Sequence, residues 1–261
     1  MMRSFLRLSY NGMSYHGWQI QPHDESVQQR LEESLSTLLR QPTAVTGAGR
    51  TDAGVHARTM YAHFDHDEEI ADKRRFLHSL NRLCGRDIVT YDLISVADDA
   101  HARFDATSRT YKYFVTYEHS PFLEGVSWHS PTRLDLEKMN RAAERLLGKM
   151  DYTSFAKLHS DTKTNICEVT RAEWSEWQNM YGVAGVVFTI TADRFLRNMV
   201  RAIVGTLVDV GRGKLTLEDF ERVIAQKDRC AAGNSMPPQA LFLWDITYPY
   251  IGDADPREKD Q

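Results

Sequence analysis

The sequence predicts an α+β fold built from two similar halves, and three observations lead to this prediction. Several segments alternate apolar and polar residues with the period of two that is typical of a strand. Other segments carry apolar residues at the spacing of an amphipathic helix. The order strand, helix, strand, strand, helix, strand occurs twice, and it is typical of a ferredoxin-like unit. For 261 residues, at about 150 residues a domain, we expect two ferredoxin-like domains at residues 1–105 and 106–261.

The first half contains six predicted elements. Residues 5–10 alternate around Arg7 and predict a strand. Ser26 and Gln29 form the S-x-x-Q pattern of a capping box, so we expect a helix to begin there. Apolar residues recur after it at helical spacing: Val27, Leu31, Leu35, Leu38 and Leu39. The remaining elements are strands at Thr43–Thr46 and Val55–Phe64, a helix from Asp72 to about Leu83 and a strand at Ile88–Val96.

The second half begins after a link near residues 99–107. Residues 111–117 alternate in the manner of a strand. Asp135 is placed to cap a helix that reaches Leu147, and Gly148 follows where a C-terminal glycine is common. The remaining elements are strands at Ile166–Trp177 and Tyr181–Thr191, helices at Phe195–Val210 and Thr216–Ala225, and a strand at Ala240–Tyr248.

Charge and cysteine content narrow the class of protein. The net charge of −4 argues weakly against a nucleic-acid partner, but the acids concentrate in residues 65–72 and 253–260, and elsewhere bases outnumber acids. Cys84, Cys167 and Cys230 match no disulfide or zinc-site spacing. The sequence shows no signal peptide and no run of 18 apolar residues. We expect a cytoplasmic protein with no membrane segment and no metal site.

Several common catalytic motifs are absent from the sequence. Gly211–Lys214 lacks the first glycine and the hydroxyl residue of a phosphate-binding loop. The histidines never form H-E-x-x-H, and no serine lies in a G-x-S-x-G context. These absences exclude a nucleoside triphosphatase with this loop, a zinc protease of that type and an α/β-hydrolase.

The loop at residues 47–56, between two predicted strands, is the main candidate for a site. Gly47, Gly49 and Gly54 allow unusual backbone conformations and the close approach of a ligand. Asp52 places a carboxylate in the same loop. The simpler interpretation is that Asp52 forms an Asx turn, and the spacing alone does not decide between the two.

Two basic segments are further candidates. Arg194, Arg197 and Arg201 recur at i, i+3 and i+7 of a predicted helix and are expected to share one face. A solvated helix face is the commoner cause of such a pattern. Basic and aromatic residues alternate along Arg109–Tyr113, which suits stacking on bases and contact with phosphates, although half-buried aromatic strands are also common.

The glycine loop, G-R-T-D-A-G-V-H-A at residues 49–57, resembles the signature loop of the TruA-type tRNA pseudouridine synthases. Other segments match this family in the same order: Y-H-G-W-Q at 15–19, H-A-R-F at 101–104, R-T-Y-K-Y at 109–113, F-L-R-N-M-V-R at 195–201 and A-L-F-L at 240–243. The motifs span the chain from about residue 5 to 248. Asn11 and residues 236–239 depart from the family pattern, and both lie outside the catalytic loop.

The resemblance implies a fold and an activity. It implies two ferredoxin-like halves whose antiparallel sheets join across a central catalytic cleft, with helices packed on the sheets. It implies a homodimer that uses no cofactor. The implied reaction is isomerisation of uridine to pseudouridine at nucleotides 38, 39 and 40, in the anticodon arm of tRNA.

The resemblance also implies roles for individual residues. Asp52 corresponds to the catalytic aspartate, which acts either as a nucleophile at ribose C1′ or as a base on the C2′ proton, and the sequence leaves both routes open. Arg201 corresponds to the cation that keeps this carboxylate ionised in a water-excluding cleft. The other expected substrate contacts are Arg50 in the space left by the flipped base, Tyr111 on the uracil, Leu241 in the base pocket and Arg58 on a phosphate.

Two alternative functions fit the same residues. A non-catalytic protein could bind structured RNA through the same cleft and the same arginines. An N-glycosidase would cleave the bond between C1′ and N1 and release uracil. Loss of product in an Asp52→Asn variant that still binds RNA separates an enzyme from the binding protein, and free uracil identifies the glycosidase.

Overall fold

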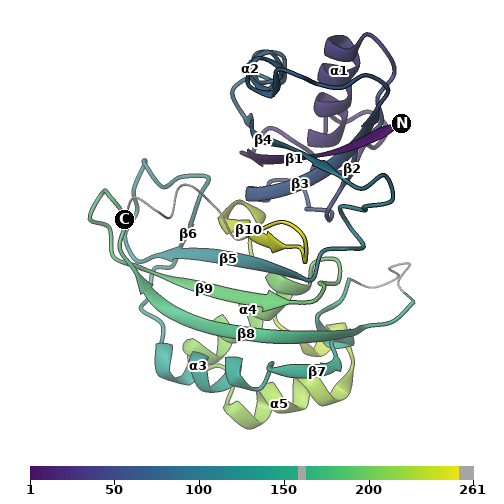
Figure 1. The fold of residues 1–261 in the computed structure, drawn as a ribbon. Coiled ribbons are helices and arrows are strands. Elements are labelled where there is room, and N and C mark those ends of the chain that lie inside the picture. The colour runs from purple at the N-terminus through teal and green to yellow at the C-terminus, as the bar shows by residue number, and fades with distance from the viewer. Residues whose placement is uncertain (158–162, 253–261) are drawn as a thin grey trace.

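The computed structural model describes residues 1–157 and 163–252, and in this part of the chain ten strands form one mostly antiparallel sheet (Figure 1). The strands are β1 (Met2–Tyr10), β2 (Thr46–Gly47), β3 (His56–His66), β4 (Ile88–Val96), β5 (Ser108–Thr116), β6 (Trp128–His129), β7 (Gly148–Asp151), β8 (Ile166–Trp177), β9 (Gly185–Ala192) and β10 (Leu241–Thr247). Their order across the sheet is β4-β1-β3-β10-β5-β9-β8-β7, while β2 pairs with β3 and β6 pairs with β5. Because helices pack beside this sheet, the predicted α+β class is confirmed.

Two helices, α1 (Val27–Leu39) and α2 (Lys73–Cys84), lie beside the N-terminal strands (Figure 1). The Ser26 hydroxyl accepts a hydrogen bond from the Gln29 backbone N–H at 3.2 Å and begins α1 as predicted. The Gln29 side chain donates to Glu33 instead of reaching back, so one half of the predicted capping box forms. A carboxylate, that of Asp72, caps α2 in the same way.

Three helices, α3 (Leu136–Glu144), α4 (Met199–Gly211) and α5 (Leu217–Gln226), lie beside the C-terminal strands (Figure 1). The prediction of a helix from Phe195 was wrong at its start, because Asn198 adopts a left-handed conformation with φ of 64° and α4 begins only at the next residue. Arg194 and Arg197 therefore lie in a loop. The prediction that they share a helix face with Arg201 was wrong for the same reason.

Other predicted boundaries differ by a few residues. The helix α3 ends at Glu144, and Gly148, with φ of 100°, begins the unpredicted strand β7. The strand predicted at residues 43–46 is reduced to the two residues of β2, and β9 begins four residues later than predicted. The strands β4 and β8 have the predicted bounds. Short pairings such as β7 have no periodic pattern long enough to reveal them.

The buried apolar side chains form two cores, one in each half, and β10 contributes to both. Leu241 packs in the C-terminal core, whereas Leu243 and Ile246 pack in the N-terminal core. The same strand is parallel to β3 and antiparallel to β5, so it joins the two halves into one sheet. No helix in the described ranges is long and apolar enough to cross a membrane.

Candidate active site

The glycine loop lies where the edge of β3 changes partner. The end of β3, at His63 and Ala62, pairs with β2. The start of β3, at His56 and Ala57, pairs with β10 from the other half. Residues 48–55 connect β2 to β3 between these two pairings. The candidate loop therefore lies at the junction of the two halves.

Close backbone approaches fix the path of this loop. A Cβ atom on Gly47 would lie 2.4 Å from the ring of Trp18, and one on Gly17 would lie 2.4 Å from the carbonyl oxygen of Thr51. Gly17 also has φ of 87°, which a side chain would strain. In contrast, a Cβ on Gly49 would meet no atom within 4 Å. The Y-H-G-W-Q segment thus packs directly against the loop that carries the carboxylate.

Hydrogen bonds to Thr51 hold the residue immediately before Asp52. The Trp18 backbone N–H donates to the Thr51 carbonyl oxygen at 3.2 Å. The hydroxyl groups of Thr51 and Tyr10 are 2.9 Å apart, and both side chains are buried. Because β1 carries Tyr10, this contact ties the loop to the sheet of the N-terminal half.

The Arg109 guanidinium, on β5, ties the loop to the C-terminal half. It donates to the backbone carbonyl oxygens of Ala48 at 3.2 Å, of Ala106 and Asp193 at 2.8 Å, and of Arg103. Burial lowers the pKa of Arg109. One side chain therefore connects the start of the candidate loop, the link between the halves and the loop before α4.

Asp52 lies between two guanidinium groups. Nη1 of Arg201 donates to Oδ2 of Asp52 at 3.2 Å, and Nε of Arg197 lies 3.8 Å from Oδ1. The Arg201 side chain is 19% exposed, and its Nε donates to the Met236 carbonyl oxygen at 2.6 Å. The Arg197 side chain is 64% exposed. Arg201 is thus a fixed counter-ion for the carboxylate, whereas Arg197 is held more loosely.

Tyr111 and Leu241 lie on neighbouring strands at this site. The Tyr111 ring packs edge-on against Phe195, with 5.1 Å between the ring centroids. Burial raises the pKa of Tyr111, and the negative charge of Asp52 raises it further. The phenol therefore stays protonated at neutral pH and can donate a hydrogen bond. Leu241 is buried in the C-terminal core, on the strand that pairs with β5.

Residues 142–249 match a family model described as tRNA pseudouridine synthase. The chain is 54% identical over 249 residues to tRNA pseudouridine synthase A of Parabacteroides distasonis, covering 95% of this chain and 97% of that protein. It is 55% identical to the protein of the same name from Bacteroides thetaiotaomicron, covering 95% and 91%. For Bacillus licheniformis the identity is 37% over 251 residues, covering 95% and 99%. The chain belongs to the tRNA pseudouridine synthase A family.

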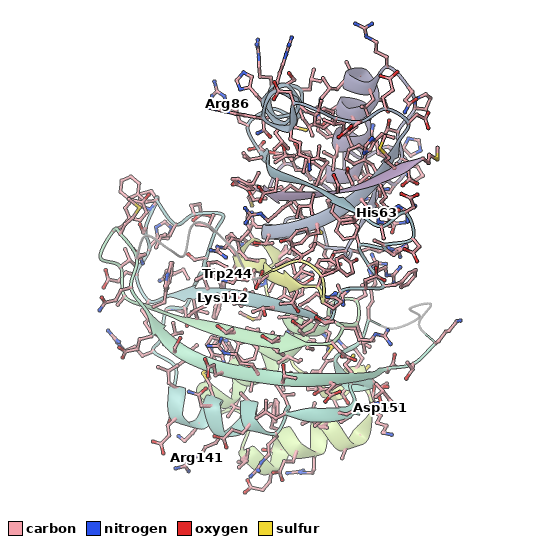
Figure 2. All side chains as sticks on the ribbon, viewed as in Figure 1. His63, Arg86, Lys112, Arg141, Asp151 and Trp244 are labelled. Carbon is pink, nitrogen blue, oxygen red and sulfur yellow. The ribbon has the colours of Figure 1, made fainter. Side chains whose placement is uncertain are left out.

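Arg50 and Arg58 do not contact Asp52. The resemblance to tRNA pseudouridine synthase A suggested that both bind RNA. Arg50 is exposed, and within the described residues its side chain has no hydrogen-bond or ion-pair partner. The Arg58 guanidinium lies 4.8 Å from the ring centroid of Trp244. Nζ of Lys112 lies 4.2 Å from the same ring centroid, and Figure 2 labels Lys112 and Trp244. Since Lys112 follows Tyr111 on β5, their side chains point to opposite faces of the sheet. Arg58 therefore lies on the face opposite Tyr111.

Sequence reasoning missed the structural role of His56, whose ring binds three backbone segments in this member of the tRNA pseudouridine synthase A family. The buried ring accepts a hydrogen bond at Nδ1 from the Gly12 N–H at 3.1 Å. Nε2 donates to the carbonyl oxygens of Gly125 and Gln239 at 2.9 and 3.0 Å. Burial lowers the pKa of His56, so the ring is neutral. Its place four residues after Asp52 in the signature motif was the available signal.

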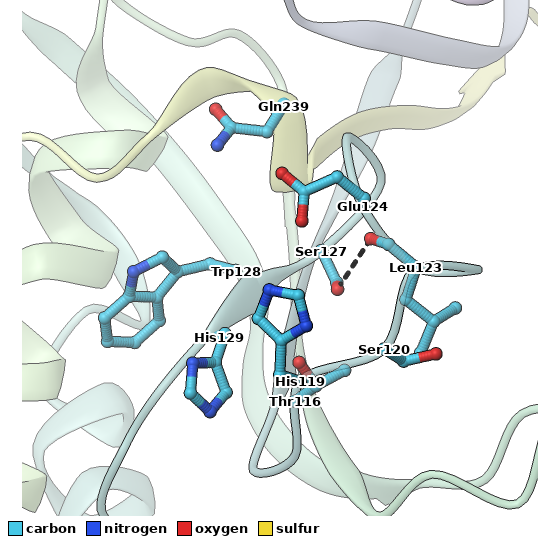
Figure 3. A pocket seen from close by; sticks show the side chains of 9 residues that line it. All are labelled: Thr116, His119, Ser120, Leu123, Glu124, Ser127, Trp128, His129 and Gln239. Atoms are coloured by element: carbon cyan, nitrogen blue, oxygen red, sulfur yellow. Dashed lines mark hydrogen bonds between the residues drawn. The ribbon is translucent and has the colours of Figure 1, made fainter.

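A cavity of about 170 Å³ lies beside Gln239, whose carbonyl oxygen is bound by His56 (Figure 3). It is lined by Thr116, His119, Ser120, Leu123, Glu124, Ser127, Trp128, His129 and Gln239. None of the predicted site residues lines it. Among the described residues, no group of three His, Cys, Asp or Glu side chains is placed to hold a metal ion.

Proposed function

We propose that the protein isomerises uridine to pseudouridine in tRNA, with Asp52 as the catalytic residue. The ion pair between Asp52 and Arg201, 3.2 Å apart at the junction of the two halves, is the observation that carries this proposal. Membership of the tRNA pseudouridine synthase A family supports it. The reaction breaks the bond from C1′ to N1, turns the uracil and joins C5 to C1′. It adds no atom and moves no electron to an acceptor.

The Asp52 carboxylate has two chemical routes to this outcome. As a nucleophile it attacks C1′, uracil leaves with the bonding electron pair, and C5 later displaces the carboxylate. As a base it removes the C2′ proton while uracil leaves, and the proton returns to C2′ when C5 adds to C1′. In both routes the C5 proton is lost to solvent. Arg201 stabilises the ionised carboxylate that both routes require.

The remaining site residues bind and position the target nucleotide in this proposal. Flipping the base out of its stack costs a few kcal/mol, and the exposed Arg50 guanidinium fills the vacated space. The protonated Tyr111 phenol packs on the uracil and donates a hydrogen bond. Leu241 lines the base pocket. Arg58 binds a phosphate only where RNA extends to the sheet face opposite Tyr111, near Trp244.

The substrate we propose is the anticodon arm of tRNA, at nucleotides 38, 39 and 40. Nucleotides in the loop and at the end of a stem lose little stacking when they flip, and this supports a hairpin substrate. A cytoplasmic location is consistent with Cys84, Cys167 and Cys230, which are free thiols in the structure. The proposal involves no cofactor.

We also propose two ferredoxin-like domains, at residues 1–105 and 106–261, with the cleft between them. The strand orders β4-β1-β3-β2 and β10-β5-β9-β8 support this division.

We further propose that the protein forms a homodimer. Partly exposed aromatic side chains of Phe242, Trp244 and Trp177 support it, because they offer an apolar surface for a second copy. Analytical ultracentrifugation of the wild type and of Trp244→Glu tests this association, which the substitution is expected to weaken.

Release of tritium from C5-labelled uridine in unmodified tRNA tests the proposed reaction. The wild type is expected to release tritium, keep the mass of the tRNA and place pseudouridine at nucleotides 38 to 40. Asp52→Asn is expected to bind the tRNA and release no tritium. Release of free uracil would instead identify an N-glycosidase. Equal inactivity of the wild type and Asp52→Asn, with tRNA bound by both, would leave only an RNA-binding function.

A further inference from the structure

The helix α2 carries positive charge without any acidic residue of its own. Lys73, Arg74, Arg75 and Arg82 lie on this twelve-residue helix, and Arg86 follows two residues after its end. All five side chains are exposed. The helix itself contains no Asp or Glu. The chain as a whole has a net charge of −4, so this concentration of cations does not follow from its composition.

The exposed arginines of α2 differ from those of the C-terminal helices in their partners. On α3, at its end and on α5, ion pairs join Arg141 to Glu137, Arg145 to Glu221, and Arg222 to Asp219. On α2, within the residues that the structure describes, no ion pair involves Arg74, Arg75, Arg82 or Arg86. These exposed guanidinium groups are therefore available to bind an anion from solution.

The geometry of α2 points to phosphate groups as the ligand. Arg75 and Arg82 are seven residues apart, so their side chains lie on one face, separated by about 10 Å along the helix axis. A guanidinium group has a planar fork of donors that matches two phosphate oxygens. Exposed acids at residues 67–69 precede the helix, whereas Arg82 and Arg86 lie toward and beyond its C-terminal end, away from these acids in the sequence.

The apolar side chains of α2 argue against a membrane as the partner. A helix that lies on a bilayer buries an apolar face in the lipid. In α2, Leu80 and Cys84 are buried in the N-terminal core, and Phe76 and Leu77 pack against the same core. The surface left for a partner is therefore mainly ionic, which is typical of contacts with a nucleic-acid backbone.

We infer that the basic surface of α2, made by Lys73, Arg74, Arg75, Arg82 and Arg86, binds tRNA phosphates outside the Asp52 site. This inference rests on the proposed function for the identity of the RNA. The helix packs on β4, at the edge of the sheet, whereas the Asp52 loop precedes β3 on the other side of β1. Figure 2 shows Arg86 at the outer end of the N-terminal half. The phosphates bound here belong to tRNA beyond the anticodon arm.

A triple variant tests the inference against a matched control. Arg75→Gln, Arg82→Gln and Arg86→Gln together remove three charges from the α2 surface. Arg141→Gln, Arg145→Gln and Arg222→Gln remove three charges from exposed arginines of the C-terminal half. Arg141 lies at the opposite end of the molecule from Arg86 (Figure 2). Circular dichroism melting shows that both variants are folded before their kinetics are compared.

Turnover is measured on full-length unmodified tRNA and on the isolated anticodon stem-loop. The α2 variant is expected to raise KM for tRNA roughly tenfold with kcat unchanged, and to leave KM for the stem-loop unchanged. The slope of log affinity against log salt is expected to fall by about 2 to 3, since each phosphate contact contributes about 0.7 to 0.9. The control variant is expected to behave as the wild type on both RNAs.

Three outcomes would overturn the inference. One is a KM of the α2 variant for tRNA that equals the KM of the control variant. A second is an equal rise in KM on the stem-loop, which would place the contact within the anticodon arm. A third is that the α2 variant loses binding to phosphatidylglycerol vesicles while its tRNA binding is unchanged. This result would indicate that α2 binds a membrane. A wild type that forms no pseudouridine would refute the proposed function, whereas direct tRNA binding by the same variants would still test α2.

Discussion

The two halves of the molecule have the same strand order but differ in their second strand. In the C-terminal half, β8 has twelve residues and pairs with the whole length of β9. In the N-terminal half, β2 has only two residues and pairs only with the end of β3. The start of β3 is left free for β10, which comes from the other half. The truncated strand is therefore what allows the two sheets to join.

The connection that follows each of these strands differs in the same way. The β8–β9 connection is a hairpin at the end of two long paired strands, whereas the β2–β3 connection carries Asp52 to the junction of the halves. Backbone groups released from strand pairing need other partners when they are buried. Trp18 and Arg109 supply hydrogen bonds to two of these groups, the carbonyl oxygens of Thr51 and Ala48. The candidate loop thus replaces regular pairing at the point where the halves meet.

The largest expected effect comes from breaking the ion pair across the junction. Arg201→Ala is expected to lower kcat at least about a hundredfold, because Asp52 loses its fixed counter-ion. Arg197→Ala is the control, and its effect is expected to stay below about tenfold because this side chain is exposed and 3.8 Å from the carboxylate. Single-turnover kinetics measure both variants. Near-normal turnover by Arg201→Ala would contradict the assigned role.

The second prediction concerns Arg109, which joins the loops of the two halves. Arg109→Lys keeps the charge but cannot donate to four carbonyl oxygens at once, so kcat is expected to fall about tenfold with a smaller change in KM. Arg3→Lys is the control, since the Arg3 guanidinium also donates several hydrogen bonds, to the Asp65 carboxylate and the Ala100 carbonyl oxygen, but only within the N-terminal half. Equal kcat values for the two variants would show that the connection between the loops has no effect on catalysis.

The third prediction compares Gly47, at the end of β2, with Gly49 in the loop that follows it. Gly47→Ala is expected to lower the free energy of unfolding by about 1 to 3 kcal/mol, because its Cβ would lie 2.4 Å from the Trp18 ring. Gly49→Ala is expected to change it by less than about 1 kcal/mol, since no atom lies within 4 Å of the added carbon. Urea denaturation measures both. Equal destabilisation would mean that close packing does not define the path of the loop.

The smallest expected effect is a difference in stability between the two halves in mild acid. Burial, together with the positive charge of Arg3, lowers the pKa of His63 to about 4. An unfolded histidine titrates near pH 6.5, so stability is constant above that pH and is lost as the pH falls from about 6.5 to 4. In the described C-terminal residues no histidine is buried. Hydrogen exchange at pH 5 is expected to accelerate first in the N-terminal half, and His63→Gln is expected to reduce this acceleration.

Local patterns predicted most of the elements because short-range physics forms them. Ser26, Asp72 and Asp135 cap helices at the predicted positions, since a side-chain oxygen needs only the backbone N–H three residues later. The start of α4 was missed because nothing in the apolar spacing shows that Asn198 adopts a left-handed conformation. The short pairings β2, β6 and β7 depend on neighbouring strands that are distant in sequence.

The amino-acid sequence alone determined the α+β class, the helix caps, the glycine loop and the resemblance that singled out Asp52. The resemblance also implied Arg201 as the partner of Asp52, but only the tertiary structure gave the contact itself, across 149 residues of chain, and placed Arg197 near the carboxylate from a loop instead of a helix. It also placed Arg58 on the opposite face of the sheet, against Trp244. The physical reason is that these contacts depend on β10 joining the two halves, and pairing between distant strands leaves no periodic signal in the sequence.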